Sequence, residues 1–194
     1  MFKQIRKSIL AALCISVGCI VNLTCVDKGF PIVGAFLFAL GLYTICSYKF
    51  DLFTGKIGYV VESKNYGEVF KILLVNLFFG YLFGLLLSVI VPDSLAQSLI
   101  NIKLSLSISE ILIKGFFCGI LMYLAVDGFK NGSPISIFLS VPVFILSGFE
   151  HCIANIIYFG MAKNIFFLEF IVFNVVGNTI GSIFISQMIN SNKQ

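Results

Sequence analysis

The chain has 194 residues, of which 59% are hydrophobic and only 11% are charged, with a formal net charge of +4. A soluble domain of this length needs far more charge to cover its surface, so the composition excludes one. The basic residues are dispersed among segment ends without an aromatic-interleaved patch, which favours a role in membrane orientation over nucleic-acid binding. We therefore predict an all-α protein that crosses a lipid bilayer several times.

Six apolar segments approach the length of about 20 residues that a membrane span needs. They cover residues 8–26, 32–61, 67–91, 108–127, 134–162 and 164–189. The first segment follows Lys3, Arg6 and Lys7 and has no small-residue cleavage pattern, so we interpret it as a retained span rather than a signal peptide.

The second and fifth segments are too long for one simple span, and each has charge near its middle. Lys49 and Asp51 lie in the second, and Glu150 and His151 lie in the fifth. Both segments are predicted to be broken helices around a shared pathway, because irregular backbone at membrane depth needs protein or water to satisfy it. The charges of Lys49 and Asp51 are expected to neutralise each other at the break.

The distribution of basic residues predicts the orientation in the membrane. With six spans and a cytoplasmic N-terminus, eight basic residues fall inside: Lys3, Arg6, Lys7, Lys56, Lys64, Lys71, Lys130 and Lys193. Four fall outside: Lys28, Lys103, Lys114 and Lys163. This excess predicts that both termini are cytoplasmic and that the protein is integral to the inner (cytoplasmic) cell membrane.

Two short patterns recur at about half the chain length. Gly80 to Gly84 recurs as Gly177 to Gly181, 97 residues later, and Phe50-Asp51 recurs as Phe149-Glu150, 99 residues later. Close helix packing is the simpler explanation of the glycine pairs. Halves of three spans each, about 1–92 and 101–194, must face opposite ways, so we predict a 3+3 inverted repeat within one channel domain, 1–194.

His151 is the only histidine, and it lies next to a carboxylate between two apolar runs. A titratable pair is expensive to keep in hydrocarbon, which makes His151 a functional candidate before any fold is considered. The six cysteines are single and scattered, unlike a zinc site or a disulfide framework. We expect reduced thiols, no metal and no cofactor.

Several motifs together resemble the formate/nitrite transporter family of pentameric small-anion channels. They are Asp51-Leu52-Phe53-Thr54, the two glycine pairs, Leu124-Ala125-Val126, and Pro142 through Asn155 with Ser-Gly-Phe-Glu-His-x-x-Ala-Asn. The resemblance implies an aquaporin-like six-helix protomer with its own pore, broken second and fifth helices, and a homopentamer.

The resemblance also implies roles for particular residues. His151 matches the central pore histidine, Thr54 the threonine that faces it, and Lys103 a vestibule lysine. The family also has an apolar constriction on each side of the histidine. Leu42 and Phe38 match one constriction, and Phe53 and Phe144 match the other. One departure is Gly119, which stands where the family usually has an asparagine in the fourth span.

A small monovalent anion cannot cross such constrictions cheaply, because removing water from an unpaired charge costs many kcal/mol. We expect Lys103 to attract the anion and His151, with Thr54, to stabilise or protonate it. Glu150 either orients the imidazole or makes a helix-terminal or interprotomer contact, and Asn155 is expected to bond free backbone groups of the broken helix.

Formate, nitrite and hydrosulfide are the substrate candidates, with a proton as possible co-substrate. Two alternatives stay open. A neutral-solute pore of aquaporin type normally carries two Asn-Pro-Ala motifs, whereas this chain has Phe53-Thr54-Gly55 and Ile153-Ala154-Asn155 at its breaks. An intramembrane enzyme is disfavoured by the absence of HExxH, Gly-x-Ser-x-Gly and a second histidine, and an assembly protein has little need of Glu150 and His151 in a break.

Overall fold

The computed structural model describes residues 2–191, which form helices and turns without a strand in that range. Met1 and Lys193, the latter counted above for orientation, lie outside the described residues. The elements are α1 (Phe2–Asp27), α2 (Pro31–Tyr48), α3 (Phe53–Lys56), η1 (Ile57–Tyr59), α4 (Val60–Ser63), α5 (Tyr66–Leu87), α6 (Asp93–Leu104), α7 (Ile108–Lys130), α8 (Ile135–Leu146), α9 (Cys152–Met161) and α10 (Leu168–Ser191). The prediction of an all-α chain is confirmed for this range.

Within residues 2–191, five helices are long and apolar enough to cross a membrane by length and composition: α1, α2, α5, α7 and α10. The apolar helices α8 and α9 are shorter. The segment predicted at 32–61 consists of α2 followed by the short α3, η1 and α4, and the segment at 134–162 consists of α8 and α9. The backbone is non-helical at 49–52 and at 147–151.

Two predicted boundaries and one connection are wrong. The helix predicted to reach residue 91 ends at Leu87, and the helix predicted from 164 begins at Leu168. The connection after α5 contains α6, which was not among the predicted segments. Ala96, Ile100 and Lys103 are buried on one face of α6, so a helical period was present in the sequence.

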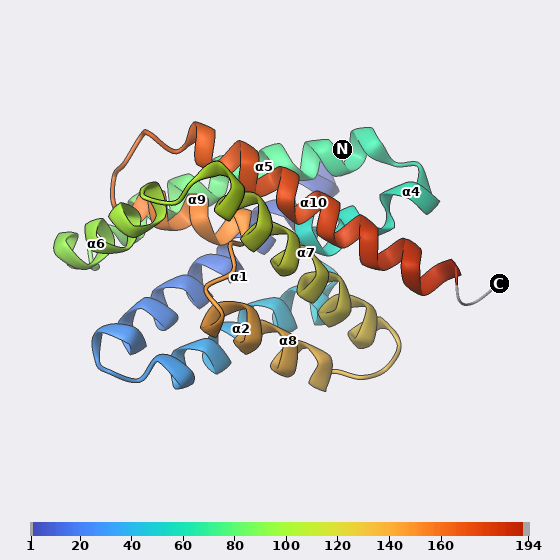
Figure 1. Ribbon diagram of the computed structural model, residues 1–194, viewed down its shortest axis with the longest axis horizontal. Helices are drawn as coiled ribbons and strands as arrows, with labels where there is room; N and C mark the ends of the chain where they lie inside the picture. The colour runs from blue at the N-terminus through green and yellow to red at the C-terminus, as the bar shows by residue number, and fades with distance from the viewer. Residues whose placement is uncertain (1, 192–194) are drawn as a thin grey trace.

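The helices pack in two groups (Figure 1). α1, α2 and α8 lie along one side of the molecule, while α5 and α10 lie along the other. Both ends of the described chain point toward the end of the long axis that carries α4 and the turn between α7 and α8. α6 and the turn between α1 and α2 lie at the opposite end.

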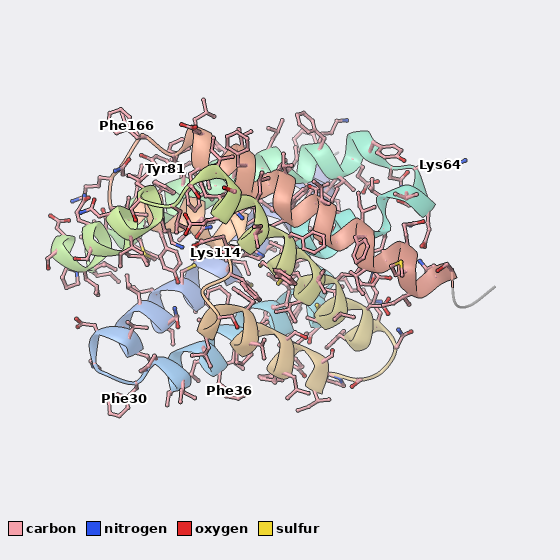
Figure 2. The ribbon with its side chains drawn as sticks, in the orientation of Figure 1. Phe30, Phe36, Lys64, Tyr81, Lys114 and Phe166 are labelled. Atoms are coloured by element: carbon pink, nitrogen blue, oxygen red, sulfur yellow. The ribbon has the colours of Figure 1, made fainter. Side chains whose placement is uncertain are left out.

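Apolar side chains cover the outside of the protein as well as its core. Figure 2 shows Phe30, Phe36 and Phe166 pointing away from the helices, and all three are exposed. Patches of this extent are rare on soluble monomers and are expected of a surface in contact with lipid or another protein.

α2 and α8 end in the same way. Lys49 (φ 56°) and Gly148 (φ 66°) are both left-handed, 99 residues apart. In each case the next amide donates back to the helix, from Phe50 N to Ile45 O at 2.9 Å and from Phe149 N to Phe144 O at 3.0 Å. This is a Schellman termination, which satisfies helix-end carbonyls where the chain leaves the helix.

The two glycine pairs serve close packing, but they do so at different interfaces. Gly80 and Gly84 lie against α9, where a methyl group on Gly84 would overlap the carbonyl of Ile157. Gly177 and Gly181 lie against α7, where a methyl group on Gly181 would overlap the carbonyl of Phe116. The two pairs therefore face different neighbouring helices, whereas Phe50 and Phe149 follow helix ends of the same kind.

Candidate functional site

The two non-helical segments bring His151 and Thr54 into contact. His151 is the N-cap residue of α9, with extended backbone, and Thr54 lies in the first turn of α3. Thr54 Oγ1 lies 2.9 Å from His151 Nε2, and both residues are buried. Residues 97 positions apart thus meet where the second and fifth segments are interrupted.

The other ring nitrogen of His151 defines the tautomer. The backbone N–H of Ala154 donates to His151 Nδ1 at 3.1 Å. An acceptor nitrogen carries no hydrogen, so the neutral ring has its hydrogen on Nε2, which donates toward Thr54 Oγ1. An imidazolium would direct a second N–H at the Ala154 amide and at the positive end of α9.

Two buried asparagines hold the interrupted segments, and sequence reasoning missed their role. Asn76 accepts from Phe53 N at 2.8 Å and donates to Asp51 O at 3.2 Å and Ser8 O at 2.8 Å. The Asn76 side chain thus provides hydrogen-bond partners for backbone groups that a continuous helix would satisfy within itself. The signal that could have identified it was an amide residue in the middle of an apolar span.

Asn178 makes the same set of contacts at the other interruption. It accepts from Cys152 N at 2.9 Å and donates to Glu150 O and Gly115 O, both at 2.8 Å. Each asparagine therefore bonds an amide just after the interruption, a carbonyl just before it, and a carbonyl of one further helix, which is α1 for Asn76 and α7 for Asn178.

The carboxylate of Glu150 is held away from the imidazole. Its Oε2 accepts from Lys103 Nζ at 2.6 Å and from Asn155 Nδ2 at 2.8 Å. Asn155 also donates to Asn174 Oδ1 at 2.7 Å, so it bonds side chains and not the free backbone groups that we expected. The prediction that Glu150 orients the imidazole is not supported, because none of its hydrogen bonds reaches His151.

Lys103, which we expected to be a vestibule lysine, lines the same cavity as His151. It is buried on α6, and its charge is paired with Glu150. Asp51, in turn, pairs with Lys56 at 3.1 Å and not with its neighbour Lys49. Each interruption thus carries one carboxylate and one paired lysine.

A cavity of about 250 Å³ reaches His151 from the side of α6. We call it the histidine cavity; its lining includes Phe38, Lys103, Phe144, Glu150, His151 and Asn155. The rings of Phe38 and Phe144 are 5.9 Å apart, and that of Phe144 is stacked 5.8 Å from His151. These two phenylalanines therefore form one apolar contact, although we had assigned them to opposite sides of the histidine.

A second cavity, of about 540 Å³, opens near the end of α2. We call it the lysine cavity, because Lys7, Lys49, Lys56 and Lys130 line it. Its apolar lining includes Leu42 and Leu52, and Leu52 was not among the predicted residues. Phe53 follows Leu52 in the chain and is buried, but it belongs to the lining of neither cavity.

Gly119 allows α7 to approach α10 closely. A methyl group there would overlap the carbonyl of Asn178, and the Gly119 carbonyl accepts from Ser182 Oγ at 2.9 Å. An asparagine side chain has no room at this position, and the buried amides near the interruptions come from α5, α9 and α10 instead.

Comparison with known proteins agrees with this arrangement. The family model described as formate/nitrite transporter matches residues 1–191. The chain belongs to the formate/nitrite transporter family. The family prediction is thereby confirmed. Membership of this family, together with the apolar helices, indicates an integral membrane protein of channel or transporter type. The matched family is not a family of enzymes.

Two solved structures share the formate/nitrite transporter fold. One, an FNT family ion channel, has a TM-score of 0.80 and 18% sequence identity, and the match covers 100% of this chain and 90% of that one. The other, a pentameric formate channel with formate bound, has a TM-score of 0.68 and 21% identity, over 99% of this chain and 95% of that one. No curated protein sequence matches this transporter.

Proposed function

We propose that the protein is a channel for a small monovalent anion of the formate, nitrite or hydrosulfide type, or for its weak acid. The observation that carries the proposal is the His151–Thr54 contact. His151 lines the histidine cavity, while Leu52 and Gly55, close to Thr54 in the chain, line the lysine cavity. Family membership supports the same class of substrate.

The conduction path runs from the lysine cavity, past Leu42 and Phe53, to His151 and Thr54, and out between Phe38 and Phe144. An anion loses its water at such constrictions, which is unfavourable unless donors replace it. His151 Nε2–H and the Thr54 hydroxyl are donors between these apolar residues, and the N-terminal end of α9 adds a positive dipole.

The geometry favours hydrogen bonding over proton transfer as the role of His151. The ring accepts from Ala154 through Nδ1, so its single hydrogen is on Nε2. A neutral imidazole donates a hydrogen bond readily but is a very weak acid. Any proton that accompanies the anion then comes from cavity water, and His151 stabilises the permeating species.

Residues near His151 and Thr54 hold the walls of the path in place. The Lys103–Glu150 pair and Asn155 fix the wall of the histidine cavity, so Lys103 contributes structure as well as local positive charge. The matched hydrogen bonds of Asn76 and Asn178 support a six-span inverted repeat in which the second and fifth helices are broken within the membrane.

We further propose a single channel domain over 1–194, five copies of which form a homopentamer with one path per protomer. The likeness to a pentameric formate channel and the wide apolar surface support this assembly in a lipid bilayer. Both termini face the cytoplasm of an inner (cytoplasmic) membrane, as the excess of basic residues predicts.

Two substitutions of His151 separate its possible roles. Asparagine keeps the cap on Ala154 but cannot reach Thr54, whereas glutamine keeps a non-titrating donor near Nε2. We expect His151→Asn to lower anion flux about tenfold to a hundredfold, the value of one hydrogen bond to a charged group. His151→Gln is expected to stay within a few-fold of wild type.

The measurement is flux of formate, nitrite, hydrosulfide and chloride into proteoliposomes across a pH series. If both variants lose flux completely, His151 transfers a proton and the hydrogen-bond role is wrong. If neither variant changes flux or its pH dependence, His151 is not on the path. Wild-type flux no greater than that of empty liposomes for every anion would reject the channel function.

A further inference from the structure

Lys49 occupies a backbone conformation that disfavours its own side chain. Its φ of 56° is left-handed, and the corresponding residue of the other half is Gly148. Glycine adopts this conformation without steric cost, whereas a lysine does so only where the surroundings impose it. Lys64 and Lys163 share this conformation, so it is the position of Lys49 at a cavity that makes it a candidate for function.

Lys49 lies at a cavity with an excess of positive charge. Four lysines line the lysine cavity, and only Lys56 is neutralised, by Asp51. The histidine cavity differs, because its Lys103 is paired with Glu150 at 2.6 Å. An approaching anion therefore meets a different electrostatic potential at each end of the path.

Among the lysines of this cavity, Lys49 alone combines an exposed side chain with the absence of an ion pair and of a cation–π contact within residues 2–191. Lys130 lies 3.3 Å from the centre of the Tyr59 ring, which holds its ammonium group. Lys7 likewise forms no ion pair within residues 2–191, but it is only partly exposed. Lys49 is exposed and forms no ion pair within residues 2–191.

We propose that the lysine cavity is a capture site for the permeant anion and that Lys49 is its principal charge. This inference rests on the proposed channel function. An unpaired ammonium group at the rim of a concave, apolar-walled cavity concentrates the field and raises the local anion concentration. Leu42 and Leu52, which share this cavity, form its exit toward Thr54.

The test uses three variants with matched backbones. Lys49→Gly removes the charge and the strain together, so its melting temperature is expected to equal or exceed that of wild type. Lys49→Arg restores the charge. Lys64→Gly is the control, because Lys64 has the same left-handed backbone (φ 55°) but lies outside both cavities and points away from the protein (Figure 2).

The readout is the concentration dependence of labelled anion entry into right-side-out and inverted membrane vesicles from the same cells. The probe is formate, or nitrite where proteoliposomes conduct it faster. Lys49→Gly is expected to raise the half-saturating concentration about threefold to tenfold in the vesicles that expose the lysine cavity, and not in the others. The difference is expected to shrink at high ionic strength, because salt screens exposed charges.

Capture by charge is supported if Lys49→Arg has the half-saturating concentration of wild type and Lys64→Gly leaves this concentration unchanged. Equal behaviour of Lys49→Gly and Lys64→Gly overturns the inference, as does the same loss in both vesicle types. Wild-type vesicles that take up neither anion faster than channel-free vesicles overturn the proposed function itself, which is a distinct result.

Discussion

Replacing Asn178 with leucine is expected to lower the free energy of unfolding by about 3 to 5 kcal/mol, because several hydrogen bonds of about 0.5–1.5 kcal/mol each are lost and a buried amide is left unpaired. The orphaned group is the N–H of Cys152, which Asn178 accepts at 2.9 Å. Since this amide starts α9, the position of His151 changes with it. Anion flux is therefore expected to fall to the level of empty liposomes.

The measurements are the thermal midpoint of the purified protein and flux into proteoliposomes. Thr179→Val is the matched control, because the Thr179 hydroxyl only donates to Val175 O of its own helix. Its effect is expected within about 0.5 kcal/mol. Asn76→Leu is expected to behave like Asn178→Leu, since Asn76 accepts from Phe53 N in the same way. Equal stability of Asn178→Leu and Thr179→Val would show that Asn178 does not hold the break.

Removing one partner of the buried Lys103–Glu150 pair is expected to cost more than removing both. Lys103→Met leaves Glu150 buried without its cation, which typically destabilises a protein by about 3 to 5 kcal/mol. The double variant Lys103→Met with Glu150→Gln removes both charges and keeps an acceptor for Asn155. It is expected to recover most of the lost stability.

The exposed pair of Lys163 with Asp93 provides the control for this cycle. Its N–O distance is 3.3 Å, and both side chains are more than half exposed. Lys163→Met is therefore expected to change stability by less than about 1 kcal/mol. The comparison requires thermal unfolding of all four proteins at one pH and salt concentration. If the double variant is as unstable as Lys103→Met, the pair contributes through packing and not through charge.

The sequence predicted the class of fold and the place of the interruptions because both depend on local composition. Charge in the middle of a long apolar segment is costly, so Lys49 with Asp51 and Glu150 with His151 indicated where the helices end. The contact between His151 and Thr54 followed only from the family resemblance, because residues 97 positions apart meet through tertiary packing.

What the sequence did not predict depends on geometry between helices. The ion pairs Lys103–Glu150 and Lys56–Asp51 depend on the paths of α6 and α3, which no local pattern specifies. The Asn178 contacts were missed for the same reason, although an amide in an apolar span signals a buried network.

An anion that follows the proposed path crosses the protein past the ring of Phe144. Phe144 is buried in the lining of the histidine cavity, whereas its neighbour Val143 is 49% exposed. The most direct measurement is anion flux through Phe144→Cys and Val143→Cys proteoliposomes before and after a negatively charged thiol reagent, with the reagent's effect on wild type as the baseline. We predict block of Phe144→Cys alone. Flux through Phe144→Cys that is untouched after modification of that cysteine would contradict a path at this position.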